Sequence, residues 1–250
     1  LPLDTLAYLI VITVGLLFGS FTNVIIARMP VGESIVFPPS HCPYCHERLK
    51  ALDLVPVFSY LFLRGHCRYC QQAISIRYLL VEILCALLFM GVYLRWGLTM
   101  TTMSGWVFTV ILLGAAFIDI DHGIIPDRLT YPGIIIGLVL SFWTLGFLPA
   151  LWGLLAFGGL MFAAALISNG GMGGGDVKLA AVIGAFTGIT GSAITLLLSS
   201  FSGAIFGLII MAVYKTGRKT PIKFGPFLAI SAYIAFLFAD AIALCYLGFF

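Results

Sequence analysis

Charged residues are scarce in this chain. Asp, Glu, Lys and Arg together make up 9% of its 250 residues, while hydrophobic residues make up 61%. Soluble globular domains carry about a quarter charged residues, so this composition excludes a soluble domain and indicates a membrane protein with several spans. The formal net charge is only +3, and no soluble basic face is available to attract nucleic acid. We therefore expect no nucleic-acid partner, and a lipid bilayer as the surroundings of most of the chain.

Polar interruptions between the apolar runs are few. A transmembrane helix needs about 20 apolar residues to cross a hydrocarbon core of roughly 30 Å. Helices are the expected element because they satisfy their own backbone hydrogen bonds in lipid. We predict an all-α polytopic membrane protein with about eight transmembrane helices, at residues 6–27, 78–96, 101–119, 130–147, 149–167, 178–189, 192–214 and 226–248.

Basic residues are absent ahead of the first span and almost absent from one side of the membrane. Residues 1–5 contain no Lys or Arg, unlike the start of a secretory signal peptide, so we expect the first span to stay in the mature chain. If the N-terminus lies outside, 12 of the 13 Lys and Arg residues fall on the inner side and only Arg95 falls outside. Cytoplasmic loops retain basic residues, so this orientation is predicted, with Asp119 and Asp176 at cytoplasmic ends of their spans.

One stretch, residues 29–77, is long and polar enough to form a domain outside the bilayer. It divides the chain into a first transmembrane helix (1–28), a small cytoplasmic domain (29–77) and a membrane domain with about seven helices (78–250). Beyond this division we identify no internal repeat of fixed period.

The cytoplasmic stretch holds four of the six cysteines. Cys42, Cys45, Cys67 and Cys70 form two C-x-x-C pairs with 21 residues between them. This spacing predicts a tetrahedral, zinc-ribbon-like site, in which each pair forms a knuckle and the intervening segment forms a short hairpin. A disulfide is the main alternative, although the reducing cytoplasm disfavours it, and redox-active or unmetallated thiols remain a second one.

Two aspartates stand out against the apolar background. Asp119 ends the span 101–119, and Asp176 follows the run Gly170–Gly175 (with Met172 inside it). A carboxylate beside a membrane span is by default a functional-site hypothesis. Two carboxyl groups that share a proton and a water are the machinery of an aspartic protease. The glycines would let an extended substrate approach the backbone, whereas the competing interpretation is a tight turn with Asp176 as a helix N-cap. Lys178 either influences the charge of Asp176 or anchors its span.

Several segments resemble those of the bacterial type IV prepilin peptidases, which are leader peptidases and N-methyltransferases of the G-x-G-D membrane aspartic protease family. The resemblance covers nearly the whole chain. The matching segments are Gly19–Val24 with Arg28–Pro30, Ser40–Cys45, Pro56 to Cys70, Ile74 to Glu82, Asp119 with Pro126–Asp127, and Gly173–Lys178.

This resemblance implies an endopeptidase that removes the basic leader of prepilins and pseudopilins after a Gly, on the cytoplasmic side of the bacterial inner membrane. It implies that Asp119 and Asp176 are the catalytic pair, that the four cysteines hold structural zinc, and that S-adenosylmethionine donates a methyl group to the new N-terminus. Gly173, Gly174, Gly175 and Lys178 would form the active-site loop. The residues show no site for the methyl donor, because no strand, glycine turn and helix of the dinucleotide type is present.

Four other functions remain open on the residues alone. Two are enzymes: a peptidase without methyltransferase activity, and a G-x-G-D intramembrane protease with another substrate. The third is a zinc-stabilised transporter in which Asp119 and Asp176 bind ions, and the fourth is a non-catalytic scaffold of a pilus or secretion machine. The oligomeric state and the particular pilin substrate are not predicted.

Overall fold

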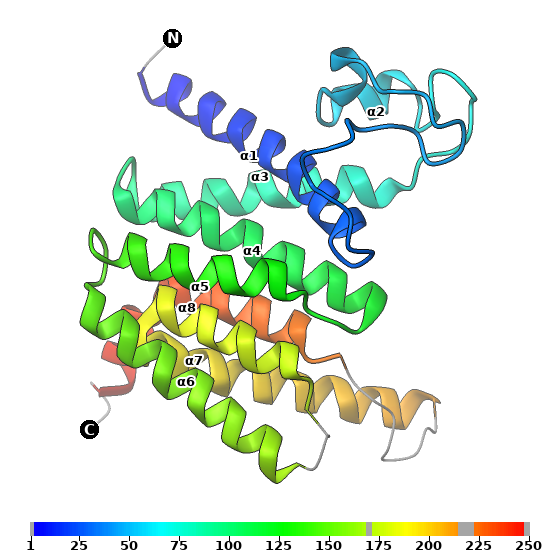
Figure 1. The fold of residues 1–250 in the computed structure, drawn as a ribbon. Helices are drawn as coiled ribbons and strands as arrows, with labels where there is room; N and C mark the ends of the chain where they lie inside the picture. The colour runs from blue at the N-terminus through cyan, green and yellow to red at the C-terminus, as the bar shows by residue number, and fades with distance from the viewer. Residues whose placement is uncertain (1–2, 169–171, 215–222, 248–250) are drawn as a thin grey trace. The chain divides into compact units, whose positions relative to one another are not determined.

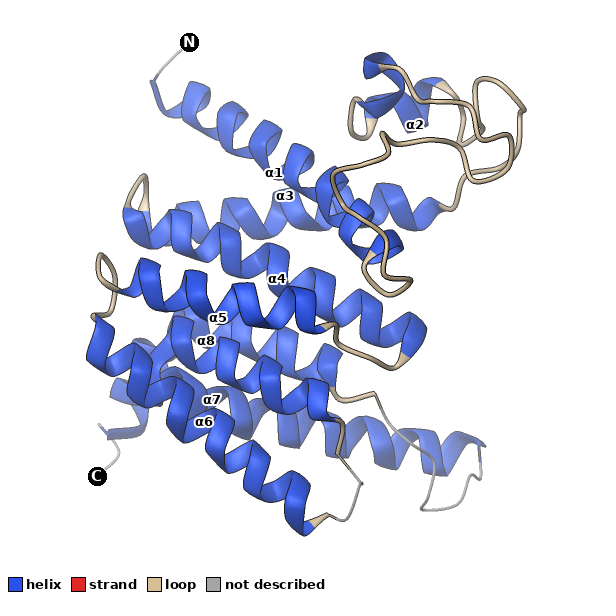
Figure 2. Ribbon diagram, in the orientation of Figure 1, coloured by secondary structure: helices blue, strands red, loops and turns tan. Residues whose placement is uncertain are grey.

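The computed structural model describes residues 3–168, 172–214 and 223–247, and in these residues every regular element is a helix, as Figure 2 shows. The predicted all-α class is therefore confirmed. The elements in chain order are α1 (Leu3–Arg28), η1 (Ala51–Leu54), α2 (Phe58–Phe62), α3 (Ile76–Trp96), α4 (Met100–His122), α5 (Asp127–Ser141), α6 (Phe147–Ile167), α7 (Gly174–Tyr214) and α8 (Gly225–Leu247). Gly170 and Gly171 of the glycine run, and the basic residues Lys215, Arg218 and Lys219 between the last two predicted spans, lie outside the described residues.

Within the described ranges, six helices are long and apolar enough to cross a membrane: α1, α3, α4, α6, α7 and α8. The predicted span 130–147 is the exception. Its helix, α5, has 15 residues and ends at Ser141, and a turn follows in which Gly146 has a φ of 95°. At 1.5 Å per residue α5 reaches only about 23 Å, short of a full crossing. Apolar residues fill this turn, so the length of the apolar run did not reveal it.

The long helix α7 contains two of the predicted spans, 178–189 and 192–214. Its helical geometry breaks at Gly188, where φ is 64° and ψ is −167°. Figure 1 shows that the yellow first half and the gold second half of α7 run in opposite directions. Gly188 lies beside Leu145 at one end of the bundle, while the ring centroid of Phe206 lies 5.2 Å from that of Phe227 near the start of α8, with the two rings tilted at 54°. Positive φ suits glycine, so the chain can reverse here with no intervening loop.

Two compact units divide the chain, residues 1–114 and 115–250, and α4 begins in the first and ends in the second. In the first unit α1 and α3 pack at very short range. A Cβ on Gly15 would lie 2.6 Å from the Cα of Ala86, and one on Gly19 would lie 2.6 Å from the Cα of Glu82. Small residues at helix contacts allow such close approach in membranes, where van der Waals packing drives association.

In the second unit glycines bring α6 onto the first half of α7. A Cβ on Gly153 would lie 2.4 Å from the carbonyl oxygen of Gly184, and one on Gly158 would lie 3.0 Å from Ala181. On α5, a Cβ on Gly137 would lie 2.8 Å from the ring of Phe186. These contacts align the starts of α5 and α7 at one end of the unit, which is the end that holds the candidate active site.

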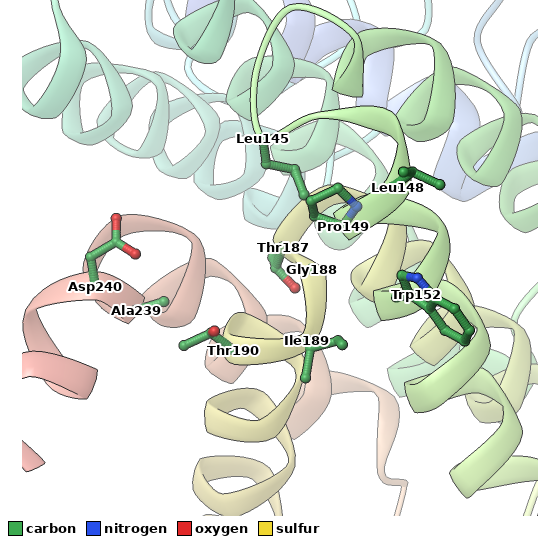
Figure 3. A pocket seen from close by; sticks show the side chains of 10 residues that line it. All are labelled: Leu145, Leu148, Pro149, Trp152, Thr187, Gly188, Ile189, Thr190, Ala239 and Asp240. Carbon is green, nitrogen blue, oxygen red and sulfur yellow. The ribbon is translucent and has the colours of Figure 1, made fainter. Parts of the chain in front are cut away.

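A pocket of about 470 Å³ opens at the other end of this unit, where α7 reverses. Leu145 and Pro149 lie over Gly188, and Asp240 of α8 stands to one side (Figure 3). Neither Asp119 nor Asp176 lines it. The pocket is therefore separate from the two predicted catalytic carboxylates.

Candidate active site and metal centre

Asp119 is held in a buried position near the end of α4, with 6% of its surface exposed. The backbone N–H of Gly225 donates a 3.0 Å hydrogen bond to its Oδ2. Gly225 is the first residue of α8, so the carboxylate also faces the positive end of that helix. A Cβ at position 225 would lie 2.7 Å from Oδ2, which leaves glycine as the residue that fits.

Lys223 supports the same segment from outside. Its Nζ donates a 2.5 Å hydrogen bond to the carbonyl oxygen of Ile120, and its positive charge attracts the carboxylate of Asp119. Neither Lys223 nor Gly225 was predicted from the sequence as a partner of Asp119. The sequence signal that could have indicated a helix start here is the pair Gly225–Pro226 at the start of the last span, because proline is favoured in the first turn of a helix.

Asp176 lies in the first turn of α7, half-buried, and its N–H donates to the carbonyl oxygen of Gly173 at 3.1 Å. It is inside the helix, so the N-cap interpretation is wrong. The negative charge of Asp119 acts on Asp176, so the two carboxyl groups, which come from different helices of one unit, interact electrostatically. Sequence spacing alone did not show this interaction.

The glycines before Asp176 differ in what surrounds them. A Cβ on Gly175 would lie 2.9 Å from the Cβ of Ile125 and 3.1 Å from its backbone nitrogen. Gly175 therefore permits the close contact between the start of α7 and the segment that follows α4. Gly173 and Gly174 are exposed, and a Cβ on Gly174 would meet nothing within 4 Å. This part of the loop is open beside the carboxyl pair.

Lys178 points to α5 and is paired there. Its Nζ lies 2.5 Å from Oδ1 of Asp127 and 5.2 Å from the ring centroid of Tyr131. The ammonium group thus connects the starts of α5 and α7. The two roles considered for Lys178, an influence on the charge of Asp176 and an anchor for the cytoplasmic end of its span, stay predictions.

The four cysteines come together as the spacing predicted. Their Sγ atoms all lie within 4.8 Å of one another, and those of Cys42 and Cys70 are 3.8 Å apart. A tetrahedral zinc ion with bonds of about 2.3 Å needs sulfur atoms about 3.8 Å apart. The cluster fits such an ion, and four thiolates would complete its coordination.

The two C-x-x-C segments form equivalent turns. The N–H of His46 donates to the carbonyl oxygen of Cys42 at 2.9 Å, and that of Gln71 donates to Cys67 at 3.0 Å. His46 and Gln71 also share a positive φ, 58° and 56°. This local duplication was not recognised from the sequence, because the residues after the second cysteine of each pair differ in type.

Hydrogen bonds around Cys42 favour its thiolate, the form that binds metal. Burial raises the pKa of this thiol, but the backbone N–H groups of Cys45 and Tyr44, together with neighbouring thiols, outweigh burial and lower it to about 7. Of the remaining cysteines, Cys85 is buried and Cys245 is exposed, and neither belongs to the cluster.

The segment between the two pairs differs from the prediction. Instead of a hairpin it contains η1 and α2. Asp53 in η1 accepts hydrogen bonds from Arg68 Nε at 2.6 Å, Tyr69 Oη at 2.9 Å and the Lys50 N–H at 3.1 Å. Burial raises the pKa of Asp53, but these donors prevail and hold it below its usual value. The helical segment is favoured over a hairpin because it places the Asp53 carboxylate against the second cysteine turn.

The fold and the site define a polytopic helical membrane protein with a four-thiol cluster in one unit and two electrostatically coupled carboxyl groups in the other. Comparison with known protein families shows to which family the chain is related. The bacterial peptidase A24 N-terminal domain matches residues 13–96, and the type IV leader peptidase family matches residues 106–208. The chain belongs to the type IV leader peptidase family.

Its relatives are similar over almost their whole length. The chain is 37% identical to the prepilin leader peptidase/N-methyltransferase of Aeromonas hydrophila, over 98% of this chain and 95% of the relative. It is 35% identical to the protein of the same name from Stutzerimonas stutzeri, over 95% and 93%. The protein of that name from Bacillus subtilis is 33% identical, over 93% and 95%. No solved structure matches the chain.

Proposed function

We propose that this chain is a membrane aspartic endopeptidase that removes the basic leader of type IV prepilins and pseudopilins after a Gly, with Asp119 and Asp176 as its catalytic pair. The relatives are named prepilin leader peptidases and N-methyltransferases, and the enzyme class follows from the family. The observation that carries the mechanism is the electrostatic interaction between Asp119 and Asp176, two carboxyl groups from different helices of one unit.

Such a pair has the chemistry that peptide hydrolysis needs. One carboxylate takes a proton from a water molecule, and the other carboxyl group donates a hydrogen bond to the scissile carbonyl. Like charges at short range disfavour two ionised carboxylates, so the pair holds one proton between its two members. The exposure of Gly173 and Gly174 supports an approach by an extended substrate at the start of α7, since a helical peptide bond is shielded from attack.

The orientation we propose places this site at the cytoplasmic face of the bacterial inner membrane. Asp119, Asp176 and Gly225 lie at one end of their unit, and the distribution of basic residues favours the cytoplasm for that end. A prepilin presents its basic leader on this side and its apolar segment to the bilayer. The substrate thus reaches the carboxyl pair from the membrane surface.

Zinc, in this proposal, is structural. Cys42, Cys45, Cys67 and Cys70 would bind it in a closed four-thiolate shell, which leaves no position for a substrate or a water. Bound metal would supply folding free energy to a small module whose own core is limited.

The second activity is methylation of the newly exposed N-terminus, with S-adenosylmethionine as the methyl donor. It is supported by the N-methyltransferase in the names of the relatives. The peptidase and the transferase would act in sequence, because the α-amino group exists only after cleavage.

The test is processing of a purified prepilin by the purified protein in detergent, for wild type, Asp119→Asn, Asp176→Asn and Asp240→Asn. Asp240 is an exposed aspartate at the other end of the same unit and serves as the matched control. We expect wild type and Asp240→Asn to cleave, and the other two to lose cleavage while keeping their thermal unfolding temperature. With S-adenosylmethionine present, mass spectrometry should show a gain of about 14 Da, one CH₂ group, on the new N-terminus. Cleavage by either active-site variant at the wild-type rate would refute the catalytic pair.

A further inference from the structure

The carboxyl pair has unequal surroundings, and the difference comes from the segment Lys223–Gly225 before and at the start of α8. We propose that this segment is a positioning element that makes Asp119 the charged base of the pair and leaves Asp176 as the proton-bearing acid. The inference rests on the proposed function and assigns the two roles within it. The segment lies outside the part of the chain that the family model matches, residues 106–208.

Gly225 is placed to serve Asp119. At the start of α8, the N–H groups of Phe227 and Leu228 both donate to the carbonyl oxygen of Phe224, and Pro226 has no N–H. The N–H of Gly225 is directed to Oδ2 of Asp119 instead. A hydrogen bond to the ionised form of a carboxyl group favours that form, and the positive end of the helix acts in the same direction. The bond also fixes Oδ2 and leaves Oδ1 to face a water.

Lys223 adds a charge and a mechanical connection. Its ammonium group attracts Asp119, and its hydrogen bond to the carbonyl oxygen of Ile120 ties the segment to the residue that follows Asp119. Movement of this segment would therefore move both the donor at Gly225 and the charge at Lys223.

Asp176 has a backbone donor but no cation. The N–H of Gly173 donates to its carboxylate, and among the residues that the structure describes the charged group that acts on it is Asp119, whereas Lys223 acts on Asp119. A carboxyl group beside a fixed negative charge, with no positive charge to offset it, is more stable with its proton. The two environments thus separate an ionised Asp119 from a protonated Asp176.

The reaction balances with these roles. Asp119 takes a proton from water as the water oxygen bonds to the scissile carbonyl carbon, and the proton of Asp176 moves to the carbonyl oxygen, giving a neutral gem-diol. When the C–N bond breaks, the leaving nitrogen takes the proton held by Asp119, and one gem-diol hydroxyl returns a proton to Asp176. One water is consumed and both carboxyl groups return to their starting states.

The first experiment locates the charged carboxylate chemically, by treating the full-length wild-type protein in detergent with a small aryloxy epoxide. An ionised carboxylate opens the ring: its oxygen forms an ester bond to a ring carbon, the ring C–O bond breaks, and the resulting alkoxide takes a proton from water. Peptide mass spectrometry then reports the ester on each aspartate, with exposed Asp240 as the reference for non-specific labelling. We expect Asp119 to be esterified well before Asp176. Equal labelling, or Asp176 first, would overturn the inference.

The second experiment changes the positioning segment and measures kcat and KM separately. Lys223→Met should lower kcat by about 10- to 100-fold with KM changed less than about twofold, because substrate binding does not use this residue. Lys223→Arg keeps the charge and should restore most of the rate, and Lys50→Met in the cysteine module is the control for loss of a lysine. Gly225→Ala should lower kcat further, since its Cβ would overlap Oδ2 of Asp119. Wild-type kcat in Lys223→Met, or failure of Lys223→Arg to restore it, would overturn the proposal.

These results are separable from a failure of the proposed function. If Asp119→Asn and Asp176→Asn abolish cleavage but the epoxide labels Asp176 first, the carboxyl pair stands and the assigned roles are wrong. If both variants still cleave, the pair itself is wrong whatever the epoxide labels.

Discussion

Lys178 and Asp127 form an ion pair, 2.5 Å from Nζ to Oδ1, between the start of α7 and the first turn of α5. Asp176 lies two residues before Lys178, so the pair fixes the position of one proposed catalytic carboxyl group relative to a neighbouring helix. An exposed pair contributes only about 0–1 kcal/mol to the free energy of unfolding. Its larger effect should therefore be on the rate.

We expect Lys178→Met to lower kcat by about tenfold, equivalent to about 1.4 kcal/mol in activation free energy, while the unfolding temperature stays close to wild type. The exchange of both charges, Asp127→Lys with Lys178→Asp, should recover part of the loss. Kinetics of the two single variants and the double variant measure this coupling. Additive losses would show that the ion pair does not position Asp176.

The cysteine cluster predicts one zinc ion per chain. The double variant Cys42→Ser, Cys45→Ser should lose the metal, and residues 29–77 should become sensitive to added protease, because the module depends on metal for its folding free energy. Cys245→Ser is the matched control, since Cys245 is exposed and outside the cluster. Elemental analysis and limited proteolysis give the two measurements. Full zinc content in the double variant would contradict the assignment of the site.

Asp53 should make the cysteine module sensitive to acid. Its pKa is lowered by Arg68, Tyr69 and the Lys50 N–H, so its contribution to stability is present above its ordinary value of about 4 and is lost as the pH falls through the lower, folded-state value. Asp53→Asn should therefore reduce the protease resistance of the module at pH 7, and the gap to wild type should narrow on acidification. An equal gap at pH 7 and at pH 3 would refute this account.

Packing of α6 on α7 can be tested with two glycines from the same helix. Gly153→Ala places a Cβ 2.4 Å from the carbonyl oxygen of Gly184, whereas a Cβ on Gly159 meets nothing within 4 Å. Gly153→Ala should destabilise the protein by roughly 1–3 kcal/mol or more, and Gly159→Ala should be neutral or slightly stabilising. Thermal unfolding in detergent compares them. Similar unfolding temperatures for both variants would show that this close contact is not formed.

Much of the fold was predictable because the length and apolar content of a span are properties of its own residues and can be read without knowing its neighbours in space. The eight predicted spans correspond to α1, α3, α4, α5, α6, the two halves of α7, and α8. The shortness of α5 was not predictable, since the turn after Ser141 uses apolar residues that read as a continued span. The prediction of a hairpin between the cysteine pairs was wrong. The segment η1 is stabilised by hydrogen bonds from Arg68 and Tyr69, which lie later in the chain and were not identified from the sequence as its partners.

The site was predictable only in part. The clustering of the four cysteines is confirmed, since paired C-x-x-C spacing encodes a metal geometry directly. The roles of Asp119, Asp176 and the glycine loop stay predictions. The partners of Asp119 could not be found from spacing, because Gly225 reaches it through a backbone N–H, which every residue except proline carries.

The most direct test of the account is a comparison of single-turnover cleavage rates for Asp119→Asn, Asp176→Asn and the double variant, with the prepilin saturating. When two groups act as one catalytic unit, removing either group abolishes most of the rate enhancement, and removing the second group as well costs little more. We expect each single variant to fall by at least about 10⁴-fold, and the double variant to be no slower than the slower single variant. A single variant within tenfold of wild type, or a double variant slower by the product of the two single losses, would contradict a catalytic pair.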